Sequence, residues 1–327
     1  MNAQFDLLPA LKKLVARTNL SHKEISQALD AILGGGMSDA AIAAFLVAFS
    51  MKGETAEELW SVLLSLRNHA TRITPNVQGP LIDTCGTGGD SIRSFNISTA
   101  AAIVASAAGA KVAKHGNRSV SGLCGSADFF EYIGLDLNAP PAKVQSCIEN
   151  VGIGFLFAPL FHPTMKYVAP ARKIIGIRTV FNMVGPLSNP CTNISGQVIG
   201  VFDPALLKVF AQVCQGHISE AMIVHAHDGF DELSNSCEND ILWVSGDRQT
   251  KRIRLHPRAV GMHVAKPEEL LVSSKEESIR NTLQSVYGKA SREKQDMVVL
   301  NAAAALVVCK IIHDIKDGVE IARDTIK

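Results

Sequence analysis

A glycine-rich run at residues 83–90, Asp-Thr-Cys-Gly-Thr-Gly-Gly-Asp, has the composition of an anion-binding loop. Glycines between a strand and a helix let backbone N–H groups converge on a phosphate, because they accept turns that other residues avoid. The run lacks Gly-Lys-Ser/Thr and a clear Gly-x-Gly-x-x-Gly, which disfavours a nucleoside triphosphate or NAD site. Polar residues then mark the expected start of a helix: Ser94, Asn96, Ser98 and Thr99. A tight turn with an ordinary helix cap is the alternative interpretation.

A second segment, residues 114–122, reads Lys-His-Gly-Asn-Arg-Ser-Val-Ser-Gly and follows a predicted strand. Lys114 supplies a point charge and Arg118 a bidentate fork, and either can neutralise a pyrophosphate leaving group. A solvated basic loop has a similar composition. The prediction of a polyanion site therefore depends on the glycine run upstream.

Asp231 and Glu232 follow a predicted strand and an Asp-Gly turn at 228–229, where two carboxylates can bind Mg²⁺. Adjacent carboxylates are also common on surfaces, so this pair predicts a metal site only together with a pyrophosphate site. Arg172 lies in a stretch rich in proline and glycine, and it can hold a carboxylate or lie on a helix surface.

The elements that must position these residues differ along the chain. Residues 1–72 are predicted to be helical, with capping residues at Ser21, Ser38 and Thr55. A stretch with Pro75, Gly79 and Pro80 then indicates a crossing into a second domain. From there, short strands alternate with helices. Strands are expected at 81–82, 111–114, 197–202 and 221–226, and helices at 98–108 and 296–310.

These patterns predict an α/β fold in two domains. A small N-terminal helical domain spans 1–72 and is completed by helices around 165–190. A larger α/β domain spans 73–327, with a central mixed, mostly parallel sheet flanked by helices.

The composition of the 327 residues disfavours several classes of protein. The 32 lysines and arginines nearly balance the 31 aspartates and glutamates, so we expect no nucleic-acid partner. The longest apolar run, 100–110, is about half the roughly 20 residues of a membrane span, so we expect no membrane association. The seven cysteines are odd in number and form no Cys-x-x-Cys pair. Together with an N-terminus unlike a secretory signal, they predict a cytoplasmic location.

The chain resembles the nucleoside phosphorylase-like phosphoribosyltransferases, and among them those that act on anthranilate in tryptophan biosynthesis. The resemblance covers nearly the whole chain and is carried by residues 83–90, 95–99, 114–118, 125–128, 176–190 and 229–232. It implies transfer of the phosphoribosyl group of phosphoribosyl pyrophosphate (PRPP) to the amine of anthranilate, with Mg²⁺ as cofactor. It also implies a homodimer, with PRPP on the larger domain and anthranilate between the two domains.

The resemblance implies a role for individual residues. PRPP contacts fall on Gly86, Gly89, Asp90, Ser94, Asn96, Ile97, Ser98, Thr99, Lys114, His115, Gly116, Asn117, Arg118, Ser119, Val120, Ser121, Gly122 and Ser126. Metal positions fall on Ser98, Asp231 and Glu232, and anthranilate positions on Gly86, Asn117 and Arg172. Two positions depart from the family: Ser94 replaces a threonine, and residues 122–124 replace small polar and basic residues.

The reaction implied here needs no strong protein base, because the aromatic amine of anthranilate is already neutral. Catalysis then depends on orientation and on stabilising the departing pyrophosphate, with Lys114, Asn117, Arg118 and Arg172 as the catalytic candidates. Two alternatives remain for a chain of this fold. One is a pyrimidine nucleoside phosphorylase, and the other is a non-catalytic relative that binds nucleic acid.

Overall fold

The computed structural model describes residues 5–88, 92–119, 122–246 and 249–327. The chain forms two compact units, one of residues 1–72 and 159–190 and the other of residues 73–158 and 191–327. No helix in these described ranges is both long enough and apolar enough to cross a membrane. The cytoplasmic location stays a prediction from the sequence.

The first unit is helical. Its elements are α1 (Leu8–Val15), α2 (His22–Leu33), α3 (Asp39–Lys52), α4 (Ala56–Asn68), η1 (Pro163–Tyr167), α9 (Ala169–Ile175), α10 (Val180–Val184) and η2 (Gly185–Leu187), and the short helix α8 (Ala158–Phe161) begins at its boundary. The predicted helix starts are confirmed, because the side chains of Ser21, Ser38 and Thr55 each accept a hydrogen bond from a backbone N–H three residues later. An ion pair of 2.6 Å between the buried side chains of Lys52 and Glu58 joins α3 to α4.

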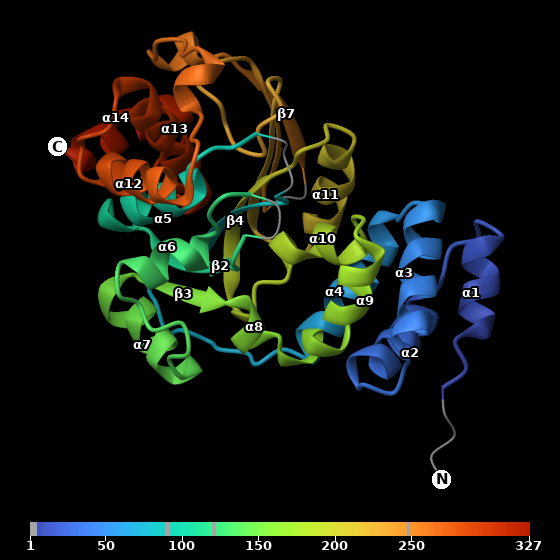
Figure 1. Ribbon diagram of the computed structural model, residues 1–327. Coiled ribbons are helices and arrows are strands. Elements are labelled where there is room, and N and C mark those ends of the chain that lie inside the picture. Colours follow the sequence, from blue (N-terminus) through green and yellow to red (C-terminus); the bar gives the residue numbers. More distant parts are fainter. Residues whose placement is uncertain (1–4, 89–91, 120–121, 247–248) are drawn as a thin grey trace. The chain divides into compact units, whose positions relative to one another are not determined.

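The second unit is built on a seven-stranded sheet with the order β3-β2-β1-β4-β5-β6-β7 (Figure 1). The strands are β1 (Leu81–Gly86), β2 (Lys111–Gly116), β3 (Ile153–Phe157), β4 (Ile194–Gly200), β5 (Glu220–Ala226), β6 (Asn239–Val244) and β7 (Thr250–Leu255). The pairs among β1 to β5 are parallel, whereas β6 is antiparallel to both β5 and β7. The predicted mixed, mostly parallel sheet is confirmed.

Helices flank this sheet. They are α5 (Ile97–Ala107), α6 (Ser126–Tyr132), α7 (Pro141–Val151), α11 (Leu206–Cys214), α12 (Lys275–Val286), α13 (Arg292–Val308) and α14 (Ile315–Ile326), with the short helices η3 (Pro257–Val260) and η4 (Pro267–Leu270). Helices α5 and α13 pack on each other and on β1 (Figure 1). Their contact is made largely by buried alanines, whose small side chains let two helices approach closely.

The order of the strands creates a switch point between β1 and β4. From β1 the chain continues outward to β2 and β3, whereas from β4 it continues in the other direction to β5. Ligands of open α/β sheets bind beyond the carboxyl ends of the strands at such a point. Residues 83–88 of the glycine run include the end of β1 and therefore lie at the switch point.

Candidate active site

Asp231 packs against the carboxyl ends of both strands at the switch point. Gly86 and Gly200 are neighbours in the β1–β4 register. A methyl group on Gly86 would lie 2.8 Å from Cγ of Asp231, and one on Gly200 would overlap the main chain of Asp231. The Oδ2 atom of Asp231 accepts a hydrogen bond of 2.7 Å from the N–H of Gly88. The Asp231 carboxylate therefore holds the glycine loop by accepting a hydrogen bond from an N–H group of that loop.

The chain around Asp231 is held by residues on either side of it. Gly229 has φ of +97° and makes the turn after β5, a conformation that favours glycine. The side chains of Phe230 and Leu233 are buried in the core of the second unit. The N–H of Leu233 also donates to Oδ1 of Asn301, at 3.0 Å. The pair of carboxylates thus extends from a turn that is anchored at both ends.

Glu232 contacts the start of α5. Its Oε1 accepts a hydrogen bond of 3.2 Å from the N–H of Ser98. The two adjacent carboxylates therefore hold two different segments, the glycine loop and the first turn of α5. The structure brings Ser98, Asp231 and Glu232 to the same end of the sheet, as expected from the polar residues that follow β1 and β5.

The oxygen atoms at this end of the sheet suit a hard cation such as Mg²⁺. Among the described residues, no group of three or more His, Cys, Asp or Glu side chains could hold a metal. Mg²⁺ commonly uses one or two carboxylates and completes its coordination with water and substrate phosphates. The carboxylates of Asp231 and Glu232 and the hydroxyl of Ser98 match a Mg²⁺ site that is completed by water and substrate phosphates.

Lys114 lies beneath the glycine loop with only 2% of its surface exposed. Its Nζ donates to the carbonyl of Thr84 at 2.7 Å and to Oγ of Ser98 at 3.3 Å. Burial lowers the pKa of Lys114, and the negative charges of Asp83 and Glu232 act in the opposite direction. The ammonium group therefore ties the end of β1 to the start of α5, which the sequence did not indicate.

The first turn of α5 begins one residue earlier than predicted, with Asn96 at the cap position and no side-chain cap bond. Instead, Nδ2 of Asn96 donates to the sulfur of Cys124, at 3.2 Å. Ile97 and Thr99 are each only 1% exposed, so both residues are buried in the first turn of α5. Ser94 forms an isolated bridge with a segment after η4. Gly89 and Asp90 lie outside the described residues.

The segment after β2 folds back onto the start of α6. Gly116 leaves the space in which Ser126 and Phe155 pack, since a methyl group there would lie 2.9 Å from the Phe155 ring and would overlap Ser126. The Oδ1 of Asn117 accepts from the N–H of Arg118 at 2.8 Å, and its carbonyl accepts from Oγ of Ser126. Asn117 is thereby held by its own loop.

Five more residues belong to the predicted basic loop, and the structure describes three of them. The N–H of His115 donates to Oδ1 of Asp83, at 3.2 Å. The N–H of Ser119 donates to Oδ2 of Asp128 at 3.2 Å, and a methyl group on Gly122 would lie 3.1 Å from Oγ of Ser119. Val120 and Ser121 lie outside the described residues.

The guanidinium of Arg118 is engaged by carboxylates of α6. Its two terminal nitrogens bind the two oxygens of Glu131 at 2.6 and 2.7 Å, and Nη1 also lies 3.3 Å from Oδ1 of Asp128. The hydrogen bonds with Glu131 raise the pKa of Arg118. The Arg118 guanidinium, which the sequence predicts to bind pyrophosphate, is therefore already bound to the carboxylate of Glu131 on α6.

Arg172 belongs to the first unit, on α9. Its Nη2 donates to Oδ1 of Asn182 at 3.4 Å, and its guanidinium lies 6.0 Å from the ring centroid of Phe181. Burial lowers the pKa of Arg172. In the part of the chain that the structure describes, no carboxylate forms an ion pair with it. A half-buried cation without a carboxylate partner suits an anionic ligand.

Burial also acts on the thiols of two cysteines in the predicted ligand loops. Burial raises the pKa of the Cys85 thiol and that of the Cys124 thiol. The thiolate is the nucleophilic form, so a raised pKa keeps both groups protonated near neutral pH. The raised pKa disfavours a nucleophilic role for either cysteine, a question that the sequence left open.

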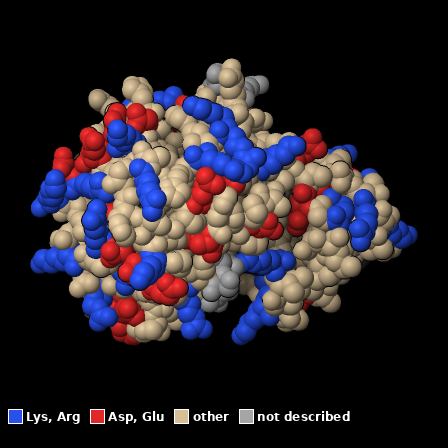
Figure 2. Space-filling view, turned by 90° about the horizontal axis from the view of Figure 1, so that it is seen from above, with Lys and Arg blue, Asp and Glu red and all other residues tan. Residues whose placement is uncertain are grey.

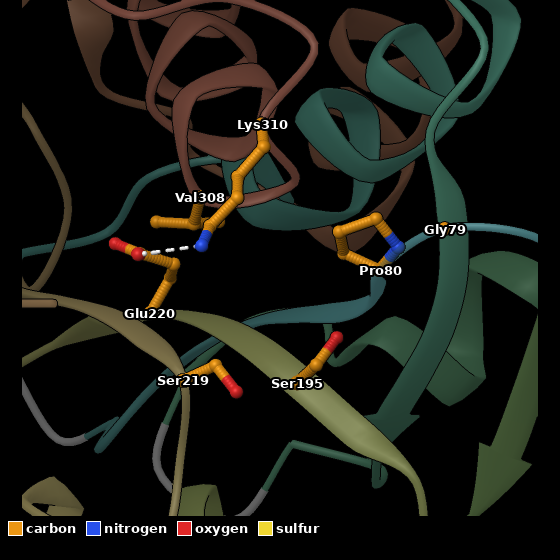
Figure 3. Close-up of a pocket in the computed structure, with 7 residues that line it drawn as sticks. All are labelled: Gly79, Pro80, Ser195, Ser219, Glu220, Val308 and Lys310. Carbon is orange, nitrogen blue, oxygen red and sulfur yellow. Dashed lines mark ion pairs between the residues drawn. The ribbon is translucent and has the colours of Figure 1, made fainter. Parts of the chain in front are cut away.

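A pocket of about 320 Å³ lies at the opposite end of the parallel strands (Figure 3). It is lined by Gly79, Pro80, Ser195, Ser219, Glu220, Val308 and Lys310. Both carboxylate oxygens of Glu220 are already engaged, one by Lys310 at 3.1 Å and the other by Nε1 of Trp243 at 2.9 Å. This pocket contains none of the predicted site residues.

Sequence reasoning missed several residues that shape the candidate site. Gly200 could have been noticed as a glycine at the end of a predicted strand. Asp128 and Glu131 are three positions apart, which places both carboxylates on one face of a helix. Lys275, which pairs with Asp128 at 2.8 Å, gave no signal because 147 positions separate the two residues.

Comparison with known proteins gives consistent results for both units. Residues 78–327 match the a/b domain of a glycosyl transferase family, and residues 8–70 match the helical bundle domain of such a family. An anthranilate phosphoribosyltransferase of Acetivibrio thermocellus is 44% identical over 321 residues, which is 98% of this chain and 92% of the relative.

Two solved structures are similar over almost their whole length. The anthranilate phosphoribosyltransferase of Thermus thermophilus has a TM-score of 0.90 and 37% identity, covering 97% of this chain and 94% of that one. The enzyme of Saccharomyces cerevisiae in complex with PRPP and Mg has a TM-score of 0.88 and 26% identity, covering 98% and 93%.

Proposed function

The chain belongs to the anthranilate phosphoribosyltransferase family, and from this premise we propose which of its residues carry out the reaction. It transfers the phosphoribosyl group of PRPP to the amine of anthranilate, giving N-(5-phosphoribosyl)anthranilate and pyrophosphate in tryptophan biosynthesis. The observation that best supports our assignment of residues is the contact of Asp231 with both strand ends and with the N–H of Gly88.

The two alternative functions are not favoured. The relatives named above cover nearly the whole chain and are transferases that act on anthranilate. On the face drawn in Figure 2, a band of Lys and Arg side chains lies beside Asp and Glu side chains. The whole chain has 32 Lys and Arg against 31 Asp and Glu, unlike the strongly basic charge that is typical of a nucleic-acid-binding protein. A phosphorylase would instead release free base from thymidine and phosphate.

Ser98, Asp231 and Glu232 would hold Mg²⁺, as argued from their oxygen atoms at the switch point. When bound, the ion supplies positive charge to the pyrophosphate of PRPP as it leaves. A relative from Saccharomyces cerevisiae has been solved with PRPP and Mg, which supports this part of the proposal.

The glycine loop, the first turn of α5 and Lys114 would bind and orient PRPP next to the Mg²⁺ ion. PRPP would bind beside the glycine loop and the first turn of α5, because the N-terminal end of a helix favours anions. The N–H groups of Gly88 and Ser98 already donate to the two carboxylates, so they fix the shape of this region. Lys114 keeps Ser98 and the carbonyl of Thr84 in position, so it acts on PRPP through them as well as through its charge. The PRPP contacts inferred from the resemblance remain part of this proposal, including those outside the described residues.

Arg172 would bind the carboxylate of anthranilate through its guanidinium, with Asn117 helping to orient the ring substituents. The amine needs no deprotonation before attack, so orientation against the ribose carbon and charge on the leaving group supply the rate enhancement. No described residue is assigned the role of a general base.

The assay that tests the proposed function follows the loss of anthranilate fluorescence with purified protein, PRPP and Mg²⁺. We expect the signal to fall with PRPP and to remain constant after chelation of the metal. Folded protein that leaves anthranilate unchanged under these conditions contradicts the proposal. Release of thymine from thymidine and phosphate would support the phosphorylase instead.

Arg172→Ala is expected to raise the KM for anthranilate by about 10- to 100-fold, because it removes hydrogen bonds to a charged group. The KM for PRPP should change little. Lys173→Ala is the matched control, since its exposed side chain is the next one on the same helix. Aniline, which lacks the carboxylate, should react equally slowly with wild type and Arg172→Ala. A larger loss for aniline than for anthranilate would contradict the assignment.

We also propose that the protein is a homodimer. The first unit exposes apolar side chains on two helices that pack together, including Val15 of α1 at 77% and Met51 of α3 at 71%. Apolar side chains that gather on a surface often mark a protein interface. Light scattering after gel filtration should give twice the chain mass of 35.0 kDa, and Val15→Glu with Met51→Glu should reduce it to one chain mass.

A further inference from the structure

Arg118 and Glu131 form a bidentate ion pair. This pair engages the same guanidinium that we propose to bind pyrophosphate. Glu131 binds both terminal nitrogens of Arg118, at 2.6 and 2.7 Å. A carboxylate presents two oxygens to the fork in the same planar geometry as a phosphate group does. Glu131 thus fills the positions that two phosphate oxygens would take.

This pair is at the surface, so exchange of the carboxylate for a ligand needs little desolvation. The side chain of Arg118 is 45% exposed and that of Glu131 is 52% exposed. Exposed ion pairs contribute little to stability, because water and salt weaken them. The ring of Phe157 lies 5.9 Å from the Arg118 guanidinium and supports its flat face from β3.

Asp128, one turn earlier on α6, is bound very differently. Only 11% of its side chain is exposed, and Oδ2 accepts from the N–H groups of Ser119 and Gly125 at 3.2 and 2.9 Å. Its Oδ1 also pairs with Lys275 of α12, at 2.8 Å. Asp128 also lies 3.3 Å from Nη1 of Arg118, but it binds the loop main chain and Lys275 as well. In the described residues Glu131 pairs with Arg118 alone.

We propose that Glu131 is an internal competitor, which occupies the Arg118 guanidinium in the absence of PRPP and yields it to the pyrophosphate when PRPP binds. Asp128, neutralised by Lys275, keeps the loop main chain in place while the fork changes partner. The proposal rests on the proposed role of Arg118 in binding PRPP. It deepens that role by naming an internal competitor for the same guanidinium.

Removing the competitor should tighten binding. Glu131→Gln leaves an uncharged side chain of the same size, so we expect the KM for PRPP to fall by about two- to fivefold, the range that exposed ion pairs reach. The Kd of inorganic pyrophosphate with Mg²⁺, measured by calorimetry, should fall by a similar factor. The KM for anthranilate should stay within error, because Glu131 does not contact the proposed acceptor residues.

Asp128→Asn should act in the opposite direction and raise the KM for PRPP, because an amide leaves Lys275 without its partner and weakens the loop anchor. Glu320→Gln on α14 is the matched control, since it removes one negative charge from an exposed helical position of the same unit. Glu320→Gln should leave the KM for PRPP unchanged.

Combining substitutions separates this proposal from the one on which it rests. Arg118→Ala should raise the KM for PRPP, and adding Glu131→Gln to Arg118→Ala should change nothing further. If Arg118→Ala alone has no effect on PRPP, the proposed role of Arg118 is wrong. If Arg118→Ala weakens PRPP binding but Glu131→Gln leaves it unchanged, or improves it equally without Arg118, the competition by Glu131 is overturned.

Discussion

Asp231→Asn is expected to lower kcat/KM for PRPP by about 10²- to 10³-fold, the size of effect that follows loss of one electrostatic group in an active site. Asparagine keeps the shape of the side chain, and its Oδ1 can still accept the hydrogen bond from the N–H of Gly88. The glycine loop therefore keeps this support, while the negative charge proposed to hold Mg²⁺ is lost. The rate should be measured over a range of Mg²⁺ concentrations.

The control for Asp231→Asn is Asp240→Asn on β6. Both aspartates are buried to a similar degree, with 8% and 7% of their surface exposed. Asp240 binds His227 and Arg252, and neither of these residues belongs to the glycine loop. Asp240→Asn should lower the melting temperature without a comparable loss of activity. Near-normal activity of Asp231→Asn at limiting Mg²⁺ would show that the metal assignment is wrong.

Gly86→Ala is expected to reduce activity by at least about 10²-fold, because displacing a catalytic group by an ångström is enough for a loss of that size. The added methyl group would lie 2.8 Å from Cγ of Asp231 and 3.0 Å from its carbonyl oxygen. Either the end of β1 or the proposed metal ligand must move. Activity should be measured while Mg²⁺ is titrated. We expect half-maximal activity at a higher Mg²⁺ concentration than for the wild type, and a lower maximum rate.

Gly246→Ala provides the comparison for Gly86→Ala. Gly246 is exposed, and a methyl group there would meet only the carbonyl of Ser219, at an ordinary distance of 3.6 Å. We expect this variant to keep both its activity and its melting temperature. Equal activities for the two alanine variants would mean that the site tolerates a methyl group at Gly86, and that the close approach of Asp231 to this position is not needed for activity.

Local features of the fold were predictable because they depend on contacts between neighbours in the chain. The cap at Ser21 is made with a backbone N–H three residues away, so side-chain chemistry within one turn specifies it. The strand composition at 221–226 and the turn after it likewise depend on adjacent residues. The pairing of β1 with β4 does not, since Gly86 and Gly200 are brought together across more than a hundred positions by packing of the whole sheet.

Within the site, residue types indicated the chemistry, and packing assigned the individual positions. Lys114 and Arg118 are both cations of one short segment, yet one is 2% exposed and bound to Thr84 and Ser98, while the side chain of the other is 45% exposed and bound to Glu131. Their spacing is four residues, so no local rule separates them. Burial does, because it depends on which distant segments cover each side chain. The sequence alone could therefore name a phosphate loop and two carboxylates, whereas the folded chain shows that Asp231 contacts the glycines and Glu232 contacts Ser98.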